Sequence, residues 1–378
     1  MLGMERRGAA TVALLLLGLL AGSSSGETWT IASLSQARGE LAATAGNGKV
    51  FFAGGAMDWP GGHPSDVVDV YDSALRTWTI AHLSQGRDGL FAASAGGKVL
   101  FGGGIYYPEY SLEDNTCPVV DICDTAGMTW TIGSIAGRSD LSAVGLAGRV
   151  VFAGGRKPCS AGWILADIYD TSTSAWSMGR LSQARFDLAG AGSGSTILFA
   201  GGVDASTGQA TQVVDTFDTG KNTWGTSTLS HPRYRLAGAS WGTKLFFAGG
   251  LDSSGPSNVV DIYDTVGGTW TTSTLPSAAG ASLAAAAEGM VFYAGGTDPN
   301  MVDVYDTFRD TWSTFMLPHP RTEFGMTAWG NQVFFAGGFD GSGNPSAVVD
   351  IYTMPEPTSL LLLGLGALAI TPRRSHRK

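Results

Sequence analysis

The chain has 378 residues, of which 55 are glycine, and carries a formal net charge of −9. Charged residues make up 15% and apolar residues 44%, which excludes a disordered polar chain, and glycine without a three-residue period excludes collagen. So much glycine makes a helical bundle unfavourable. The acidic balance argues against a nucleic-acid partner, because phosphate contacts need a basic surface. The composition therefore predicts a β-rich globular protein with many tight turns.

Residues 1–26 have the three-part layout of a secretory signal peptide. Two arginines form a basic start, an apolar run follows over residues 9–20, and the small residues Ala-Gly-Ser-Ser-Ser-Gly stand where cleavage would fall. The apolar run is too short to span a membrane comfortably. We therefore expect the chain to be exported, with cleavage between Ala21 and Gly26.

The chain then repeats itself from residue 27 to residue 353, with a period of about 50 residues. An apolar run that ends in a Gly-Gly pair occurs seven times, at residues 54–55, 103–104, 154–155, 201–202, 249–250, 295–296 and 337–338. A tryptophan recurs seven times in the same phase, as Trp29, Trp78, Trp130, Trp176, Trp224, Trp270 and Trp312. Two series in one phase indicate seven copies of one structural unit.

Each repeat is expected to form four short strands. In the first repeat these are a strand of small residues at 41–45, an apolar strand at 49–53 that ends at the Gly pair, and strands at 67–72 and 77–79. Small residues suit an innermost strand that is crowded around an axis. The Gly pair suits a strand end where another backbone comes close.

An arginine and an aspartate also recur in phase with the tryptophan. The arginines are Arg38, Arg87, Arg138, Arg185, Arg233 and Arg321, and Ala279 stands at this position in the sixth repeat. The third strand carries an aspartate in all seven repeats, as Asp69, Asp121, Asp167, Asp215, Asp261, Asp303 and Asp350. Because a residue repeated in every unit serves the scaffold, we expect these aspartates to accept hydrogen bonds from turns or to pair with the arginines.

The repeat resembles the kelch repeat, in which an apolar strand ending in Gly-Gly is followed by Tyr-Asp and then by Trp. Tyr-Asp stands at residues 71–72, 169–170, 263–264 and 305–306, with Phe217-Asp218 in the fourth repeat and Cys123-Asp124 in the second. The resemblance implies a β-propeller. The chain starts with a lone Trp strand at 27–31, and the seventh repeat lacks that strand. We therefore predict an all-β, seven-bladed propeller over residues 27–353, whose ring closes when the N-terminal strand completes the last blade.

In such a propeller, the loops between the second and third strands gather on one face together with the connections between blades, and long variable loops on a rigid scaffold are typical binding sites. The loop at 105–119 is the richest in aromatic and acidic residues. The candidate ligand-binding residues are Trp59, Tyr106, Tyr107, Glu109, Tyr110, Asp114 and Trp163. Aromatic rings beside carboxylates are typical of sugar binding, so we expect a polysaccharide or a protein as ligand.

The cysteines allow one disulfide. Cys117 and Cys159 lie in corresponding loops of adjacent repeats, and an exported chain sits in oxidising surroundings. A disulfide between them is one interpretation, and free thiols are the other. Cys123 replaces the Tyr of its repeat and is expected to be a buried, inert thiol.

The alternative class is an enzyme, a copper-dependent carbohydrate oxidase similar to galactose oxidase, which also uses a seven-bladed kelch propeller. Copper prefers imidazole ligands, and four histidines fall on the loop face, His63, His82, His231 and His319. His231 and His319 both stand in a repeated Leu-x-His-Pro-Arg linker, which favours a scaffold role. No copper motif of that family maps onto this chain residue by residue. We therefore expect no cofactor, no metal and no catalytic residue.

Residues 354–378 contain Pro355-Glu356-Pro357, an apolar run at 360–370 and an arginine-rich end. They resemble the PEP-CTERM sorting tail of bacterial exported proteins. The resemblance implies a Gram-negative host, a sorting machinery of the exosortase type as partner, and transient membrane association before the tail is removed. The expected location is the cell envelope, the outer surface or the extracellular matrix. A plain membrane anchor with a positive stop is the alternative.

Overall fold

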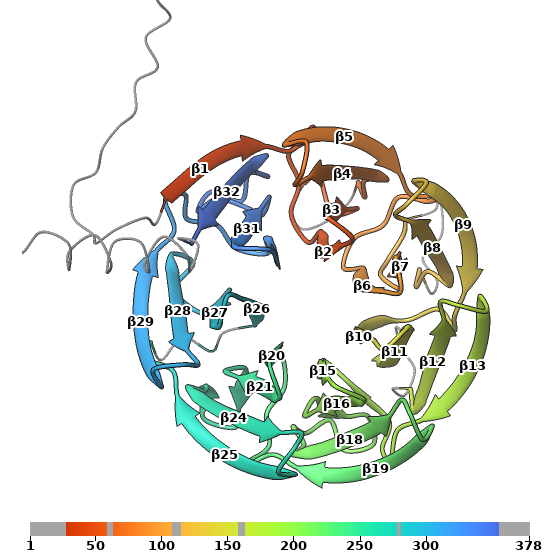
Figure 1. Ribbon diagram of the computed structural model, residues 1–378, viewed down its shortest axis with the longest axis vertical. Coiled ribbons are helices and arrows are strands. Elements are labelled where there is room, and N and C mark those ends of the chain that lie inside the picture. The colour runs from red at the N-terminus through yellow and green to blue at the C-terminus, as the bar shows by residue number, and fades with distance from the viewer. Residues whose placement is uncertain are drawn as a thin grey trace, which may run out of the picture.

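The computed structural model describes residues 28–58, 63–107, 115–157, 163–277, 280 and 282–354. In this part of the chain, seven four-stranded antiparallel sheets stand around one axis and form a ring (Figure 1). The same residues include no helix that is long and apolar enough to cross a membrane. The predicted all-β, seven-bladed propeller is confirmed. The predicted signal peptide and residues 355–378, with Pro355, Glu356 and Pro357, lie outside the described residues.

Each blade is a meander that starts at the axis and ends at the rim, and the blades are numbered in chain order. Blade 1 comprises β2 (Ala42–Gly46), β3 (Lys49–Ala53), β4 (Val67–Asp72) and β5 (Thr77–His82), and blade 2 comprises β6 (Phe91–Ala95), β7 (Lys98–Gly102), β8 (Val119–Asp124) and β9 (Thr129–Ser134). Blade 3 comprises β10 (Ser139–Leu146), β11 (Arg149–Arg156), β12 (Leu165–Asp170) and β13 (Ala175–Arg180), and blade 4 comprises β15 (Ala189–Ser193), β16 (Thr196–Ala200), β18 (Val213–Asp218) and β19 (Thr223–Thr228).

The remaining blades follow the same plan. Blade 5 comprises β20 (Ala237–Trp241), β21 (Lys244–Ala248), β24 (Val259–Asp264) and β25 (Thr269–Thr274), and blade 6 comprises β26 (Leu283–Ala287), β27 (Met290–Ala294), β28 (Met301–Asp306) and β29 (Thr311–Met316). Blade 7 comprises β30 (Gly325–Trp329), β31 (Gln332–Ala336), β32 (Val348–Thr353) and β1 (Thr28–Ser33). Two short pairs lie in the connections, β14 (Arg185–Phe186) with β17 (Val203–Asp204) and β22 (Leu251–Asp252) with β23 (Gly255–Pro256).

The two ends of the described chain close the ring in blade 7. Strand β1 pairs antiparallel with β32, with Trp29 opposite Tyr352 and Thr28 opposite Thr353. Both chain ends therefore leave blade 7 at the same edge, on the face opposite the connections between blades. This is the closure that the lone N-terminal Trp strand predicted, and it leaves no blade of the ring incomplete.

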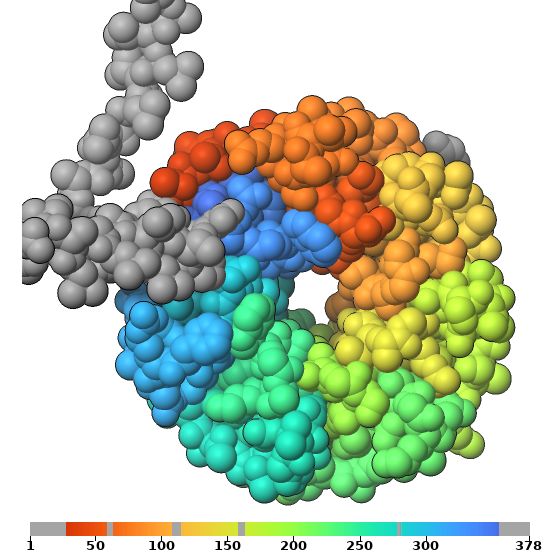
Figure 2. Space-filling view, in the orientation of Figure 1, coloured from red at the N-terminus to blue at the C-terminus, as the bar shows by residue number. Residues whose placement is uncertain are grey.

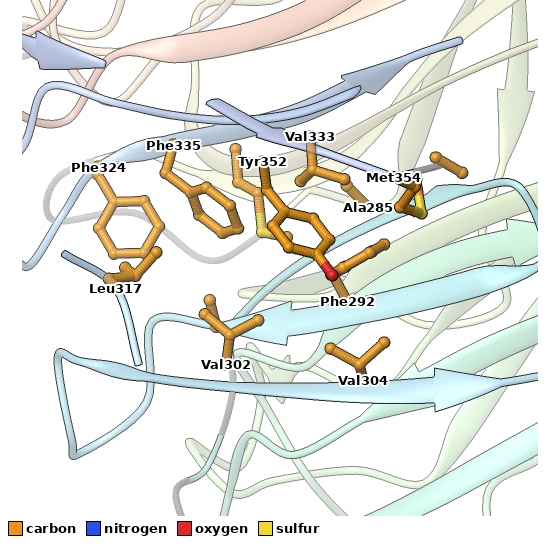
Figure 3. Packing of buried hydrophobic residues seen from close by; sticks show 13 residues of the cluster. Ala285, Phe292, Val302, Val304, Leu317, Phe324, Val333, Phe335, Tyr352 and Met354 are labelled. Carbon is orange, nitrogen blue, oxygen red and sulfur yellow. The ribbon is translucent and has the colours of Figure 1, made fainter. Parts of the chain in front are cut away.

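Apolar layers between neighbouring blades hold the ring together. The second strand of a blade is buried on both faces, as Val50, Phe51 and Phe52 of β3 show. Each buried cluster contains residues from two consecutive blades. Between blades 6 and 7, for example, Phe292 and Tyr352 pack with their ring centroids 5.8 Å apart (Figure 3). Burial of this kind stabilises a fold by about 25 cal/mol for each Å² of apolar surface.

The innermost strands are packed too closely for side chains larger than their own. A Cβ added to Gly145 would lie 2.0 Å from the carbonyl oxygen of Ser94, and one on Gly238 would lie 2.4 Å from that of Gly190. These strands surround an opening on the axis (Figure 2), and small residues line a cavity of about 230 Å³ there. The small-residue strand predicted for the axis is confirmed.

The recurring arginine and aspartate form a buried ion pair in six blades. The Nη–Oδ distances are 2.7 Å for Arg38–Asp69 and Arg87–Asp121, 2.5 Å for Arg138–Asp167 and 2.8 Å for Arg321–Asp350, and Arg185–Asp215 and Arg233–Asp261 pair in the same way. The arginine also donates to a second-strand carbonyl, as Arg38 does to Phe52, and the second carboxylate oxygen accepts from a linker amide, as Asp69 does from Ser35. These aspartates therefore both pair with arginines and accept hydrogen bonds from backbone amides, which are the two scaffold roles expected from the sequence.

Candidate functional site: the loop face and its acidic mouth

The loops and the linkers between blades meet on one face, which we call the loop face. In blade 1, the Gly55 amide donates to the Arg87 carbonyl, and the Arg87 amide donates to the Ser65 carbonyl. A Cβ on Gly55 would lie 2.4 Å from the carbonyl oxygen of Gly39, and its φ is +101°. The Gly pair therefore lets a linker and a loop approach each other, as expected from the sequence.

A ring of residues with left-handed backbone surrounds the mouth of the axial opening. We call it the axial ring, and its described members are Glu40, Gly89, Asp140, Asp187, Arg235 and Glu323, with φ between +51° and +55°. Each follows the arginine position by two residues and precedes an innermost strand. Backbone hydrogen bonds link neighbours, since Glu40 donates to the Glu323 carbonyl (2.8 Å), Gly89 to that of Glu40 (3.2 Å) and Asp187 to that of Asp140 (2.9 Å). The linkers thereby hold acidic side chains at one mouth.

One side of this mouth is acidic and has no cationic partner among the described residues. Glu40 and Glu323 of the axial ring lie there together with Asp88, which is the residue before the ring member Gly89. Burial, followed by the nearby charges of Asp88 and Glu323, raises the pKa of Glu40 to about 7. Burial, with Asp58 nearby, raises the pKa of Asp88 to about 6. Carboxyl groups with such pKa values mark candidate functional sites.

On the other side of the mouth, arginines neutralise the acidic side chains. Arg156 Nε lies 2.5 Å from Asp140 Oδ2, and its guanidinium lies over the ring of Phe186, 4.6 Å from the centroid. Arg235 Nε lies 3.4 Å from Asp187 Oδ2. Burial and Asp140 raise the pKa of Asp187 while these arginines oppose the rise. The mouth is therefore asymmetric in charge.

Of the predicted ligand-binding residues, the structure places Tyr107 at the acidic side. Its side chain is partly exposed, and burial together with the charges of Asp88, Glu40 and Asp58 raises the pKa of its hydroxyl. Tyr106 is tied to the same loop by a hydrogen bond from its amide to the Asn115 carbonyl. Trp59, Glu109, Tyr110 and Asp114 lie outside the described residues.

Trp163 lies on the loop face in blade 3. Its amide donates to the Gly155 carbonyl and its carbonyl accepts from the Arg185 amide, and its buried indole Nε1 has no hydrogen-bond partner among the described residues. It belongs to the same face as Tyr107, but no contact joins the two side chains among the described residues. Tyr106, Tyr107 and Trp163 therefore lie on one face, and of these three only Tyr107 is placed beside the acidic group.

Cys117 occupies a repeated position of the loops. It stands two residues before the third strand, where blades 1, 4, 5 and 7 carry Ser65, Thr211, Ser257 and Ser346. Its buried Sγ lies 3.5 Å from Gln85 Oε1, as the Ser65 hydroxyl bonds Gln36 in blade 1. Both Cys117 and Cys123 are buried free thiols in the structure, and burial raises the pKa of Cys123 to about 11. Cys159 lies outside the described residues, so the disulfide stays a prediction.

The four histidines do not form one site. Each pairs with a different carboxylate, His63 with Asp58, His82 with Asp66, His231 with Asp252 and His319 with Asp350. Within the described ranges, no group of three or more His, Cys, Asp or Glu side chains is arranged to hold a metal ion. Among the described residues, these four histidines are therefore not brought together at one point.

Sequence reasoning missed Glu40, Asp88 and Glu323. A signal was present, because an acidic residue follows the recurring arginine by one or two positions in five repeats. Its meaning depends on the left-handed backbone of the linkers and on the hydrogen bonds that join neighbouring linkers.

The fold and its repeats define a class, the seven-bladed β-propeller. A family model described as "Kelch motif" matches residues 232–274, which span blade 5. The solved structure described as "Structure of YjhT" is similar to this chain, with a TM-score of 0.54, 14% identity, and coverage of 86% of this chain and 99% of that one. At that identity the likeness shows the fold alone. No curated protein matches the chain.

Proposed function

We propose that this protein is an exported binding protein of the cell envelope or the extracellular matrix, which binds a glycan or a protein at its loop face. The observation that carries the proposal is the acidic side of the mouth, where partly buried carboxyl groups with raised pKa values lie beside the exposed ring of Tyr107. A rigid propeller that presents such groups at one mouth is suited to binding.

The position of the chain ends supports this orientation. Thr28 and Thr353 lie opposite each other in blade 7, away from the loop face. A signal peptide before Thr28 and a sorting tail after Thr353 would both attach at the far face. The loop face would then point away from any membrane that holds the tail, and it would be free to meet a ligand.

The test is retention of the purified protein on polysaccharide isolated from its host. We expect retention by the native protein and loss of at least three-quarters of it for Tyr107→Ala. The matched control is Phe308→Ala, which removes an exposed ring from the β28–β29 turn on the far face. Retention that is unchanged in Tyr107→Ala would contradict a site at this mouth. Stoichiometric copper together with peroxide production would instead support the oxidase class.

A second experiment tests export and sorting. Replacing Pro355-Glu356-Pro357 with three alanines should leave the protein at the membrane instead of the outer surface or the medium, because the sorting machinery would no longer recognise the tail. Cell fractionation measures this distribution. An unchanged distribution would contradict the sorting role of the tail, although it would leave the binding site untouched.

A further inference from the structure

The acidic side of the mouth is assembled from three neighbouring segments of backbone. The hydrogen bonds Glu40 N–Glu323 O (2.8 Å) and Gly89 N–Glu40 O (3.2 Å) hold three linkers together. Asp88 forms a two-way backbone bridge with Ile105, which stands two residues before Tyr107. Three carboxyl groups and one aromatic ring are therefore held on one side of the mouth by main-chain contacts.

The Asp88 carboxyl group has one buried oxygen without a partner. Asp88 is 3% exposed, and its Oδ2 makes no hydrogen bond with any of the described residues. A buried carboxylate oxygen without a partner is costly. On the other side of the same mouth, Arg156 and Arg235 neutralise the carboxylates, and among the described residues nothing plays that part for Asp88, Glu40 or Glu323. A cation is the kind of group that would neutralise these carboxylates.

The groups on the acidic side of the mouth favour an organic cation over a metal ion. Among the described residues, no group of three or more His, Cys, Asp or Glu side chains is arranged to hold a metal ion. Carboxylates form short, strong hydrogen bonds with an ammonium group, and an aromatic ring face attracts the same charge. The exposed ring of Tyr107 also offers a flat face, which suits the C–H face of a sugar ring better than a flexible lysine chain.

We propose that Glu40, Asp88 and Glu323 bind the ammonium group of an amino sugar whose ring packs on Tyr107. This inference rests on the proposed function, because it names the ligand of the same face. It predicts that the protein distinguishes a glycan with free amino groups from the same glycan after N-acetylation, which removes the positive charge.

The experiment is calorimetric titration of the purified protein at pH 7 with a tetramer of β-1,4-linked glucosamine, its fully N-acetylated form, and tetralysine. We expect the glucosamine tetramer to bind at least tenfold more tightly than either of the other two. In Asp88→Asn combined with Glu40→Gln, this binding should weaken at least tenfold. The matched control is Glu288→Gln, because Glu288 also has a positive φ (+48°) and lies in the β26–β27 turn on the far face.

Each outcome separates the inference from the proposed function. Equal binding of the acetylated tetramer would overturn ammonium recognition and leave glycan binding intact, whereas equal binding of tetralysine would point to a protein ligand and overturn the sugar. Binding of no oligomer, together with no retention on host polysaccharide, would overturn both. Substituting both Asp88 and Glu40 risks misfolding, because Asp88 is buried and Glu40 is half-buried. Glu323→Gln, at an exposed position, is therefore a second test. We expect it to weaken binding of the glucosamine tetramer at least threefold.

Discussion

At the scale of single residues, the mouth illustrates a conflict between binding and stability. Glu40 and Asp88 are held where burial and the repulsion of nearby carboxylates raise their pKa values to about 7 and about 6, from ordinary values of 4.5 and 3.8. The folded protein therefore binds protons more tightly than the unfolded chain at these sites. In the proposed binding site, these unpaired carboxylates therefore lower the stability of the protein when no cation is bound.

This conflict predicts a pH dependence of stability. Because the folded pKa values are raised, the contribution of Glu40 and Asp88 to the unfolding free energy is full below about pH 4 and is lost as pH rises toward 7. After a discount for the solvent that screens the partly exposed Glu40, the loss should be on the order of 1–3 kcal/mol. Asp88→Asn with Glu40→Gln should remove it, so that the variant gains stability relative to the native protein between pH 4 and pH 8. Urea unfolding across this range measures the difference, and parallel curves for the two proteins would contradict the assignment.

A second residue-scale prediction concerns the axial packing. Gly238→Ala places a Cβ 2.4 Å from the Gly190 carbonyl in the neighbouring blade, and it should lower the unfolding free energy by about 1–3 kcal/mol. Gly225→Ala in β19 is the matched control, because nothing lies within 4 Å of the added methyl. Thermal unfolding of both variants distinguishes a local clash from a general effect of losing glycine. A melting temperature equal to that of the control would show that the inner strands can shift apart.

At the scale of the strand and the blade, blade 6 departs from the repeat. Ala279 replaces the arginine, and Asp303 instead accepts from the amide and the hydroxyl of Ser277. Its Oδ1 is buried without a partner, and burial raises the pKa of its carboxyl. The blade still forms its four strands, so the ion pair is not required for a blade to fold.

Equivalent aspartates should therefore respond differently to the same substitution. Asp261→Asn in blade 5 leaves Arg233 buried without its counter-charge and should cost about 3–5 kcal/mol. Asp303→Asn in blade 6 removes an unpaired carboxyl and should be neutral or stabilising at pH 7. Chemical unfolding of the two variants side by side makes the comparison. Similar losses in both would mean that the aspartate acts through its turn hydrogen bonds alone.

Much of the blade was predictable from the sequence, and the mouth was not. The Gly pairs, the phased tryptophans and the lone strand before Ser33 dictate seven blades and their closure, because each reflects a local packing need. The grouping of Glu40, Asp88 and Glu323 depends on three linkers that meet only after the ring closes. The position of Cys117 is that of a repeated serine or threonine, a role that shows only when the blades are superimposed on the repeat, and its predicted disulfide with Cys159 stays a prediction.

At the scale of the whole molecule, stability depends on a contact between the two ends of the chain. Deleting residues 28–33 removes the outer strand of blade 7 and exposes Tyr352 and Phe335, which pack against Trp29. We expect the deletion to abolish the single cooperative unfolding transition and to make blade 7 the first site of proteolysis. Limited proteolysis with mass spectrometry locates the first cut, and a cut elsewhere in the ring would contradict this view.

The closure of blade 7 also determines when, during synthesis of the chain, the ring can form. Strand β1 is synthesised first, and its partner β32 is synthesised last among the described residues, with the other blades between them. Contacts so distant in sequence form slowly, because the chain must lose much entropy before they are made. The ring therefore cannot close until nearly the whole chain has been synthesised. A chain that crosses a membrane in an extended form would reach its final fold only after translocation is complete.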